Sequence, residues 1–475
     1  MRQIFGEWRP DQPSHLHDGL ITADGVYPIA NGYAPLPQFA AAVNGELAGP
    51  CIGAGAYRAG GSVHVFAVTA SNIYSYSTAG FTSLKSGLSG AAAVGARFVN
   101  YNELMLITNG VDPVQKFSPA SPSATSDLDA SCPTLRFMAV VRGFVVGGYA
   151  DEDPLAVAWS DNGDPATWTP GSGEAGLAIL PTGGDITGVV GGEYGLIFQE
   201  SRIVRQSYTQ DDAIWQFDEI STDIGCIAPW SLASYGRLTF FLSSKGFMAC
   251  DGIMVEAIGS EKVDRTFLAL FDRTYIDNMS AVVDPVRGLY IVSVPSSKPT
   301  SRIFIYSFGE QKWSSASVTA ERLFASLSAS IDLDGLDAIY GNLDAVPTSL
   351  DSVLFRGGYP ALMLFDGLHR LGALTGPNMP ASLVDTRKEL IVGLKARIRS
   401  VRPLTDASSP TVSIYGSNSL SEAPTETAYT ARSAGGFYRM RQSYNLSSLK
   451  LAIPAGATWS YVQGYDIEAA QGTRP

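Results

Sequence analysis

The chain has 475 residues, of which 45% are hydrophobic, 10% aromatic and 16% charged. This composition excludes a chain that is disordered over most of its length, and the lack of an apolar run of about 18 residues excludes a membrane-spanning helix. The formal net charge of −12 argues against a surface that binds nucleic acid throughout.

The charge is unevenly distributed along the chain. Residues 376–475 contain 11 Lys and Arg and 7 Asp and Glu, a net of +4, which leaves 22 basic and 38 acidic residues, a net of −16, in residues 1–375. Ordinary acidic solubility explains such a body. A DNA conduit would have the same character, because like charge keeps a passing duplex from binding to the wall.

The cysteines and the first residues bear on the cellular compartment. Cys51, Cys132, Cys226 and Cys250 are far apart and form no CxxC pair, so we predict free thiols and assembly in a reducing cytoplasm. The opening MRQIFGEWRP contains no apolar segment of the signal-peptide kind. We therefore expect no secretion by a signal peptide.

The sequence of residues 1–46 predicts an N-terminal arm. Five prolines between Pro10 and Pro37 rule out a long helix, and Leu20 to Ala30 alternates but is interrupted at Asp24-Gly25. We predict an extended arm that leads into a hairpin and supplies the strand that closes a ring with the last blade.

One pattern recurs from residue 47 to 375: a β-favouring run, a turn with Gly, Asn or Asp, and a second β-favouring run. Asp-Gly at 251–252 and 366–367 is the signal for a type I′ hairpin. The copies lie at 64–77, 103–117, 137–160, 194–208, 237–259, 288–313 and 361–374. A unit of roughly 40–50 residues repeated in this way is typical of a radial all-β protein. We predict a β-propeller of six to eight blades, seven by the number of copies.

The clearest copy is GGDITGVVGGEYGLIFQESRIVR at 183–205. Its two apolar runs favour strands, and Gly191-Gly192 permits a tight reversal between them. Glu193, Arg202 and Arg205 fall on turns and strand faces of this unit. We predict that they tie blades or subunits together through salt links of modest strength, so that changes at Arg202 or Arg205 impair ring assembly first.

Helical periodicity is scarce, with one short helix expected between blades within 263–282 and a weaker one at 348–355. After Gly376-Pro377 the pattern changes to short alternating runs. We predict a separate antiparallel β-sandwich over 376–475.

The sandwich is locally basic. Strand alternation places Lys395, Arg397 and Arg399 on one face and apolar side chains on the other. Further basic residues of this domain are Arg387, Lys388, Arg402, Arg439 and Arg441. A solvated strand face explains the pattern, and an interface with an acidic neighbour or with DNA phosphate is the functional alternative.

Candidate catalytic and metal motifs are weak. His15, His17 and Asp18 have no further His or Cys at ligand spacing, so we predict a polar loop there. WSDNGDPATWTP at 159–170 is close to the Asp-box turn of sialidase propellers, but its register differs, and such turns are structural. We predict no cofactor, no metal site and no enzymatic activity.

Several stretches resemble the tail nozzle proteins of short-tailed bacteriophages, also called packaged-DNA stabilisation proteins. They are GEWRPDQP at 6–13, GLITADGVYPIANGYAPLP at 19–37, ITNGVDPVQKF at 107–117, WSDNGDPATWTP at 159–170, residues 183–205, GFMACDGIMVEAIGSEKVDRTF at 246–267, VRPLTD at 401–406 and IPAGATWSYVQGYDIE at 453–468. They are spread over most of the chain and keep the expected order, although 118–131 has no counterpart.

The resemblance implies a structural virion protein of the tail, assembled in the host cytoplasm as a ring of about six copies. It implies a β-propeller body that retains packaged DNA and serves as the conduit for its ejection, without sequence-specific binding and without a small-molecule substrate. The implied partners are the adaptor (head-to-tail connector) proteins, with the tail fibre or needle as further ones.

Two other classes remain open at this point. A propeller on the phage exterior that binds a receptor or glycan is the main alternative, and a glycan hydrolase, which requires two opposed carboxylates, is the third. For the nozzle, the candidate subunit or adaptor interface consists of Glu193, Arg202, Arg205, Lys395, Arg397 and Arg399.

Overall fold

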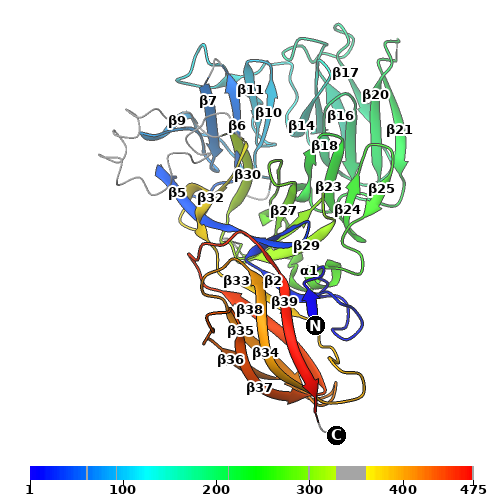
Figure 1. The fold of residues 1–475 in the computed structure, drawn as a ribbon. Coiled ribbons are helices and arrows are strands. Elements are labelled where there is room, and N and C mark those ends of the chain that lie inside the picture. Colours follow the sequence, from blue (N-terminus) through cyan, green and yellow to red (C-terminus); the bar gives the residue numbers. More distant parts are fainter. Residues whose placement is uncertain (60–61, 92–93, 212, 298–299, 328–359, 473–475) are drawn as a thin grey trace.

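The computed structural model describes residues 1–59, 62–91, 94–211, 213–297, 300–327 and 360–472. Within these residues the chain forms a seven-bladed β-propeller joined to an antiparallel β-sandwich (Figure 1). Each predicted copy falls in a different blade, so the predicted all-β propeller is confirmed. The predicted weak helix at 348–355 lies outside the described residues.

Each blade is a four-stranded antiparallel sheet. Blade 1 consists of β6 (Gly53–Ala59), β7 (Ser62–Val68), β8 (Asn72–Ser77) and β9 (Gly80–Ser86), and blade 2 of β10 (Arg97–Tyr101), β11 (Leu104–Thr108), β12 (Gln115–Phe117) and β13 (Ser126–Asp127). Blade 3 consists of β14 (Leu135–Val141), β15 (Phe144–Ala150), β16 (Asp153–Trp159) and β17 (Gly176–Ile179), and blade 4 of β18 (Ile186–Val190), β19 (Gly195–Gln199), β20 (Ile203–Tyr208) and β21 (Trp215–Ser221).

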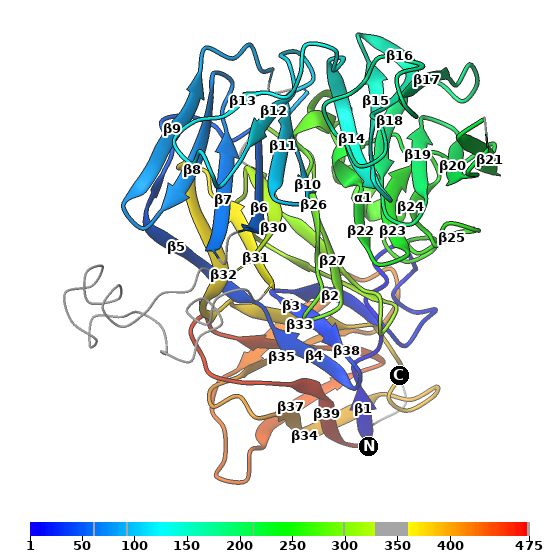
Figure 2. The ribbon, with the colours of Figure 1, turned by 90° about the horizontal axis from the view of Figure 1, so that it is seen from above.

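The remaining blades follow the same order. Blade 5 consists of β22 (Ala233–Tyr235), β23 (Leu238–Ser243), β24 (Gly246–Cys250) and β25 (Val255–Ala257), and blade 6 of β26 (Ala281–Asp284), β27 (Leu289–Ser293), β28 (Ile303–Ser307) and β29 (Lys312–Ala316). Blade 7 consists of β30 (Arg322–Leu327), β31 (Pro360–Phe365), β32 (Arg370–Asn378) and β5 (Pro37–Glu46). The first strand of each blade is the innermost, and neighbouring first strands, such as β6 with β30 and β10 with β14, contact each other around the axis (Figure 2).

Blade 4 shows why the middle strands are continuously apolar. Every residue of β19 is buried, because Ile197 packs against blade 3 while Leu196 and Phe198 pack against Phe241 of blade 5. The turn before β19 requires glycine at 191, since a Cβ there would lie 2.0 Å from the carbonyl oxygen of Val140.

The N-terminal segment closes the propeller. Strand β5 pairs antiparallel with β32, with Ala40 opposite Ala373, and so supplies the outermost strand of blade 7. The hairpin expected at Leu20–Ala30 is displaced: β3 (Val26–Ile29) pairs with β4 (Gly32–Pro35), whereas β2 (Leu20–Asp24) pairs with β33. Gly25, with φ 73°, ends β2 and lets the chain change sheets.

The sandwich contains strands from both ends of the chain. One sheet has the order β3-β4-β39-β34-β37, with β1 (Arg2–Ile4) also on β39, and the other has β2-β33-β38-β35-β36. The C-terminal strands are β33 (Ala381–Asp385), β34 (Ala396–Thr405), β35 (Thr411–Ser417), β36 (Thr425–Tyr429), β37 (Tyr438–Tyr444), β38 (Leu446–Ile453) and β39 (Val462–Gln471). The expected limits of 376–475 therefore leave out four strands that come from the first 35 residues.

Propeller and sandwich share one core. Strand β2 of the sandwich pairs in parallel with β29, the outer strand of blade 6, so a nine-stranded sheet crosses the junction. One buried cluster includes Phe240 and Trp313 of the propeller together with Val401 and Leu451 of the sandwich. This continuity fixes the orientation of the two domains.

Short helices lie between blades. The helix α1 (Asp264–Leu270), followed by the 3-10 turn η2 (Arg273–Asn278), connects blades 5 and 6 as expected, and η1 (Pro229–Ser231) precedes blade 5. The two Asp-Gly hairpins are present, but each loop has four residues instead of the two of a type I′ turn. The Asp251 carboxylate accepts the N–H groups of Ile253 and Met254, which stabilises the longer loop.

Candidate functional site

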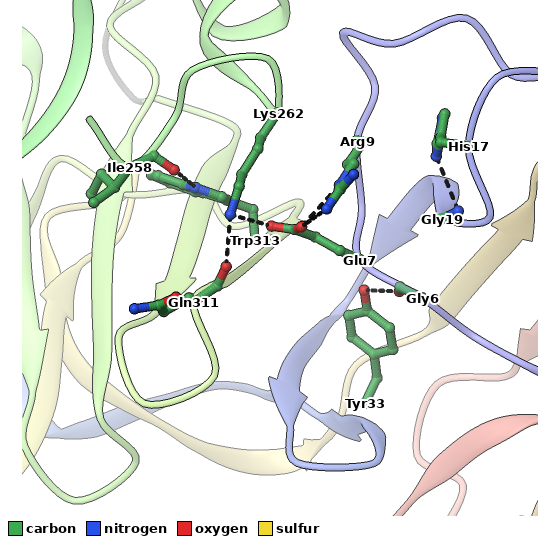
Figure 3. Close-up of polar contacts among 10 residues, drawn as sticks. All are labelled: Gly6, Glu7, Arg9, His17, Gly19, Tyr33, Ile258, Lys262, Gln311 and Trp313. Atoms are coloured by element: carbon green, nitrogen blue, oxygen red, sulfur yellow. Dashed lines mark hydrogen bonds and ion pairs between the residues drawn. The ribbon is translucent and has the colours of Figure 1, made fainter. Parts of the chain in front are cut away.

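The GEWRPDQP stretch fastens the arm to the propeller (Figure 3). The Glu7 carboxylate forms ion pairs with Arg9 at 2.8 Å and with Lys262 at 2.8 Å, and the Lys262 ammonium also donates to the carbonyl of Gln311 in blade 6. Trp8 is buried, with its ring centroid 5.3 Å from that of Phe304. The charged residues Glu7 and Arg9 of this stretch therefore form ion pairs within the chain.

Asp11 caps a helix more than 250 residues away. Its carboxylate accepts the N–H groups of Arg265 at 2.7 Å and Thr266 at 2.8 Å, at the first turn of α1. Asp264 of the same turn accepts the N–H of Phe247 and is buried against Gly246 and Gly259. Burial raises the pKa of Asp264 to about 6, and the nearby Asp11 carboxylate acts in the same direction.

We expect Asp264→Asn to stabilise the protein above pH 6. The folded state holds the Asp264 proton more firmly than the unfolded state, so the wild type loses stability as pH rises through about 6, and Asn does not. The gain in melting temperature of Asp264→Asn over the wild type should be largest at pH 7–8 and vanish on acidification to about pH 4.

Asp251→Asn provides the matched control in the neighbouring blade. Its backbone hydrogen bonds hold the pKa of Asp251 below its usual range, so the stability that the carboxylate contributes is present at neutral pH and lost in acid. Asp251→Asn should therefore be less stable than the wild type at neutral pH. Equal pH profiles for the two variants would contradict at least one of the two pKa assignments.

The structure places the candidate residues of blade 4 in contacts within the chain. Arg202 forms an ion pair with Glu219 of β21 and donates to the hydroxyl of Thr182 at 2.6 Å. Arg205 donates to the carbonyl of Gly252 and lies 4.3 Å from the centroid of the Tyr194 ring, so it joins blade 4 to blade 5. Glu193 is exposed, and its carbonyl accepts from Arg142.

A stack of Trp230 and two arginines, which the sequence did not indicate, joins three blades of the propeller. The ring centroid of Trp230, from η1, lies 3.6 Å from the Arg97 guanidinium and 4.0 Å from that of Arg322. Arg97 begins β10 and Arg322 begins β30, so the stack spans blades 2, 5 and 7. Burial lowers the pKa of Arg97 to about 9, with Arg322 contributing, and burial lowers that of Arg322 to about 10.

Four arginines gather on the outer face of the sandwich, and we call them the arginine face: Arg397 and Arg399 on β34, and Arg439 and Arg441 on β37. All four are exposed, while Ala396 and Ile398, which alternate with those of β34, are fully buried. Together with Ser400, Ser433, Phe437, Met440 and Glu468 they line a groove of about 560 Å³. Lys395, half-buried, immediately precedes β34.

Sequence alternation identifies both strands of this face. Arg439 and Arg441 repeat the two-residue spacing of Arg397 and Arg399, which puts each pair on one side of its own strand. The pairing of β34 with β37, with Ser400 opposite Arg439, is what brings the two pairs together.

The acidic charge is concentrated on two adjacent blades. Residues 126–225, which include blades 3 and 4, contain 16 Asp and Glu and 4 Lys and Arg, a net of −12, so the rest of the chain is neutral. We use the name acidic edge for four exposed residues on or beside β21, the outermost strand of blade 4: Asp211, Asp218, Glu219 and Asp223. Two of them have basic neighbours, Arg202 for Glu219 and Lys245 for Asp223.

The described residues contain no group of three His, Cys, Asp or Glu side chains that could hold a metal ion. Asp161 of the 159–170 stretch accepts the N–H groups of Asn162 and Glu174, so this carboxylate organises a turn. Among the described residues none of the four cysteines forms a disulfide. None of the helices in the described part of the chain has the length and hydropathy needed to cross a membrane.

No protein-family model matches the chain, and no curated protein matches it in sequence. Similar solved structures include PorZ of the Porphyromonas gingivalis type-IX secretion system, at 13% identity and TM-score 0.35 over 77% of this chain and 44% of that chain. The WD40 domain of Neurospora crassa Pan2 is similar at 9% identity and TM-score 0.37 over 72% and 89% of the two chains. The dihydro-heme d1 dehydrogenase NirN is similar at 12% identity and TM-score 0.36 over 83% and 76%. The propeller assignment rests on the strand pairing described above.

Proposed function

We propose that this chain is a non-enzymatic structural subunit of the tail nozzle of a short-tailed bacteriophage. In this proposal about six copies form a ring that retains packaged DNA and conducts it during ejection. The observation that carries the proposal is how the polar residues of the family-like stretches are used: they make internal structural bonds and do not converge on a pocket.

Three stretches illustrate this use. Glu7 binds Lys262, which also donates to Gln311 of blade 6, and Asp11 caps α1. In ITNGVDPVQKF the Asn109 side chain accepts the N–H groups of Val111 and Asp112, which is a turn contact. Asp251 organises the loop between β24 and β25. Such contacts stabilise a rigid scaffold, which a ring subunit requires. In this proposal the contacts with other copies and other proteins are made by the outer surfaces.

The DNA path in this proposal runs between copies. Within one propeller the Trp230 stack joins blades 2, 5 and 7 at the starts of the inner strands β10 and β30, so the proposal places the duplex outside the single propeller. Asp151, Glu152 and Asp153 lie together and exposed at the turn between β15 and β16. Carboxylates at such protruding turns suit a wall that repels DNA phosphate and does not retain it.

The test is the mass and location of the native protein. The purified chain should elute as a closed assembly near six times the 50.4 kDa of one copy, and electron microscopy of virions should place it in the tail below the adaptor. A stable monomer that binds host polysaccharide would refute the nozzle and support the exterior receptor- or glycan-binding propeller. Hydrolysis of such a polysaccharide would refute the non-enzymatic reading.

A further inference from the structure

The arginine face carries positive charge that the chain itself does not neutralise. Within the described residues its only ion pair joins Arg399 to Glu468 at 3.8 Å, and both of these side chains are more than half exposed. Arg397, Arg439 and Arg441 form no ion pair there. The four guanidinium groups line one groove, so their positive charge favours a negatively charged partner over this face.

The surroundings of these arginines favour a protein partner over a nucleic acid. Glu468 lines the same groove, and Asp466 lies on the same strand two residues before it, so phosphate would meet carboxylates as well as guanidinium groups. Phe437 at the rim is 39% exposed. Arginine with exposed aromatic side chains is the composition enriched at protein interfaces. Strand β37 is also the last strand of its sheet, and on its outer side the described residues show an isolated bridge between Tyr438 and Arg432 and no further strand.

The complementary surface is present on the same chain but out of reach. The acidic edge lies on the outer strand of blade 4, and the neighbouring outer strand β17 of blade 3 exposes Leu177 and Ile179 by 51% and 45%. In Figure 1, β21 and β37 lie at opposite ends of the molecule. The rigid junction between the domains keeps them apart, so these surfaces can meet only between two copies.

We propose that the arginine face of one copy docks on the acidic edge of blade 4 in a second copy of this chain. The contact joins unlike surfaces, and repeated head to tail it generates a closed ring where the rotation between successive copies closes. This inference rests on the proposed ring and identifies the surfaces that build it. Four arginines neutralise only part of the −12 of residues 126–225, so the exposed turn at 151–153 remains acidic for the DNA path.

Two charge-reversed chains test the docking. The first carries Arg397→Glu and Arg441→Glu, and the second carries Asp211→Lys and Asp218→Lys, all at exposed positions outside any ion pair. Each chain alone should assemble at least about tenfold more weakly than the wild type when measured by mass photometry. An equimolar mixture should recover rings in which the two chains alternate, because each reversed face then meets a reversed partner.

Matched controls separate docking from folding and from net charge. Arg237→Glu with Arg273→Glu makes the same charge change at exposed sites of blade 5 and η2, and it should leave assembly unchanged. Melting curves of all the variants should match the wild type within a few degrees, since exposed substitutions have small effects on stability.

The outcomes distinguish this inference from the proposed function. If both charge-reversed chains form rings as well as the wild type does, the ring proposal stands and the docking is overturned. Loss of rings without recovery in the mixture also overturns it, because the arginine face then meets another surface. If reversal of the arginine face abolishes the binding of duplex DNA in a gel shift but leaves the ring intact, the face binds phosphate and the docking is overturned. A wild type that forms no ring refutes the proposed function itself.

Discussion

Trp230→Ala should lower the free energy of unfolding by about 3 kcal/mol, the lower end of the range for removing a packed tryptophan, because the indole is half-buried. The loss has two sources. Truncation opens a void at the propeller axis, and it removes the ring that separates the guanidinium groups of Arg97 and Arg322. The terminal guanidinium nitrogens donate to backbone carbonyls, of Pro229 from Arg97 and of Met279 and Asp277 from Arg322, while the Nε atoms of both arginines are buried without a hydrogen-bond partner among the described residues. Chemical denaturation followed by far-UV circular dichroism measures the change.

Two further variants at the same position separate volume from ring chemistry. Trp230→Phe keeps an aromatic face between the guanidinium groups and should recover a larger share of the loss than Trp230→Leu, which fills space but presents no such face. Equal stability of the two would mean that packing alone explains the effect. A Trp230→Ala protein within 0.5 kcal/mol of the wild type would contradict the stack as a structural element.

The repeat could be predicted from the sequence because each blade has the same local pattern of apolar strands and turn residues. Middle strands such as GLIFQ are buried on both faces and are therefore continuously apolar, and Gly, Asn and Asp mark the turns between them. Local signals of this kind do not depend on the partner strand. They gave the number of blades, the helix between blades 5 and 6, and the exposed side of β34.

Pairings between distant segments could not be read in this way. Alternation indicates that Arg2–Ile4 or Leu20–Asp24 is a strand, but it does not indicate that their partners are β39 and β33. The same limit applies to charged residues. The sequence predicts contacts between blades or subunits for Arg202 and Arg205, but only the register of β20 with β21 and the position of the Gly252 turn reveal their partners.

The Trp230 stack has no sequence signal at all. Its three members are separated by more than 90 residues from one another, and each looks like an ordinary loop or strand-end residue. The propeller brings them together only because it is closed, which places the starts of all inner strands around one axis. Residues that meet through closure of a ring are in general invisible to local patterns.

Deletion of residues 1–36 should abolish the native fold, although the deleted arm contains only short strands. The arm buries Phe5, Trp8, Leu20, Val26 and Tyr33 in the core shared by propeller and sandwich. At roughly 1.5–3 kcal/mol for each buried side chain, their loss removes about 8 to 15 kcal/mol, which equals the whole stability of a typical domain. The deletion also exposes the edges of β39 and β33 to aggregation.

Asp11→Ala provides the graded comparison, because it removes one helix cap and leaves the arm in place. It should cost about 1 kcal/mol and a small decrease in melting temperature. Soluble yield, circular dichroism and limited proteolysis distinguish the two cases. A truncated chain that remains soluble and melts cooperatively near the wild-type temperature would show that β33 to β39 form a sandwich without the arm. The shared core would then add little to the stability of either domain, and the fixed orientation on which head-to-tail docking depends would lose its physical basis.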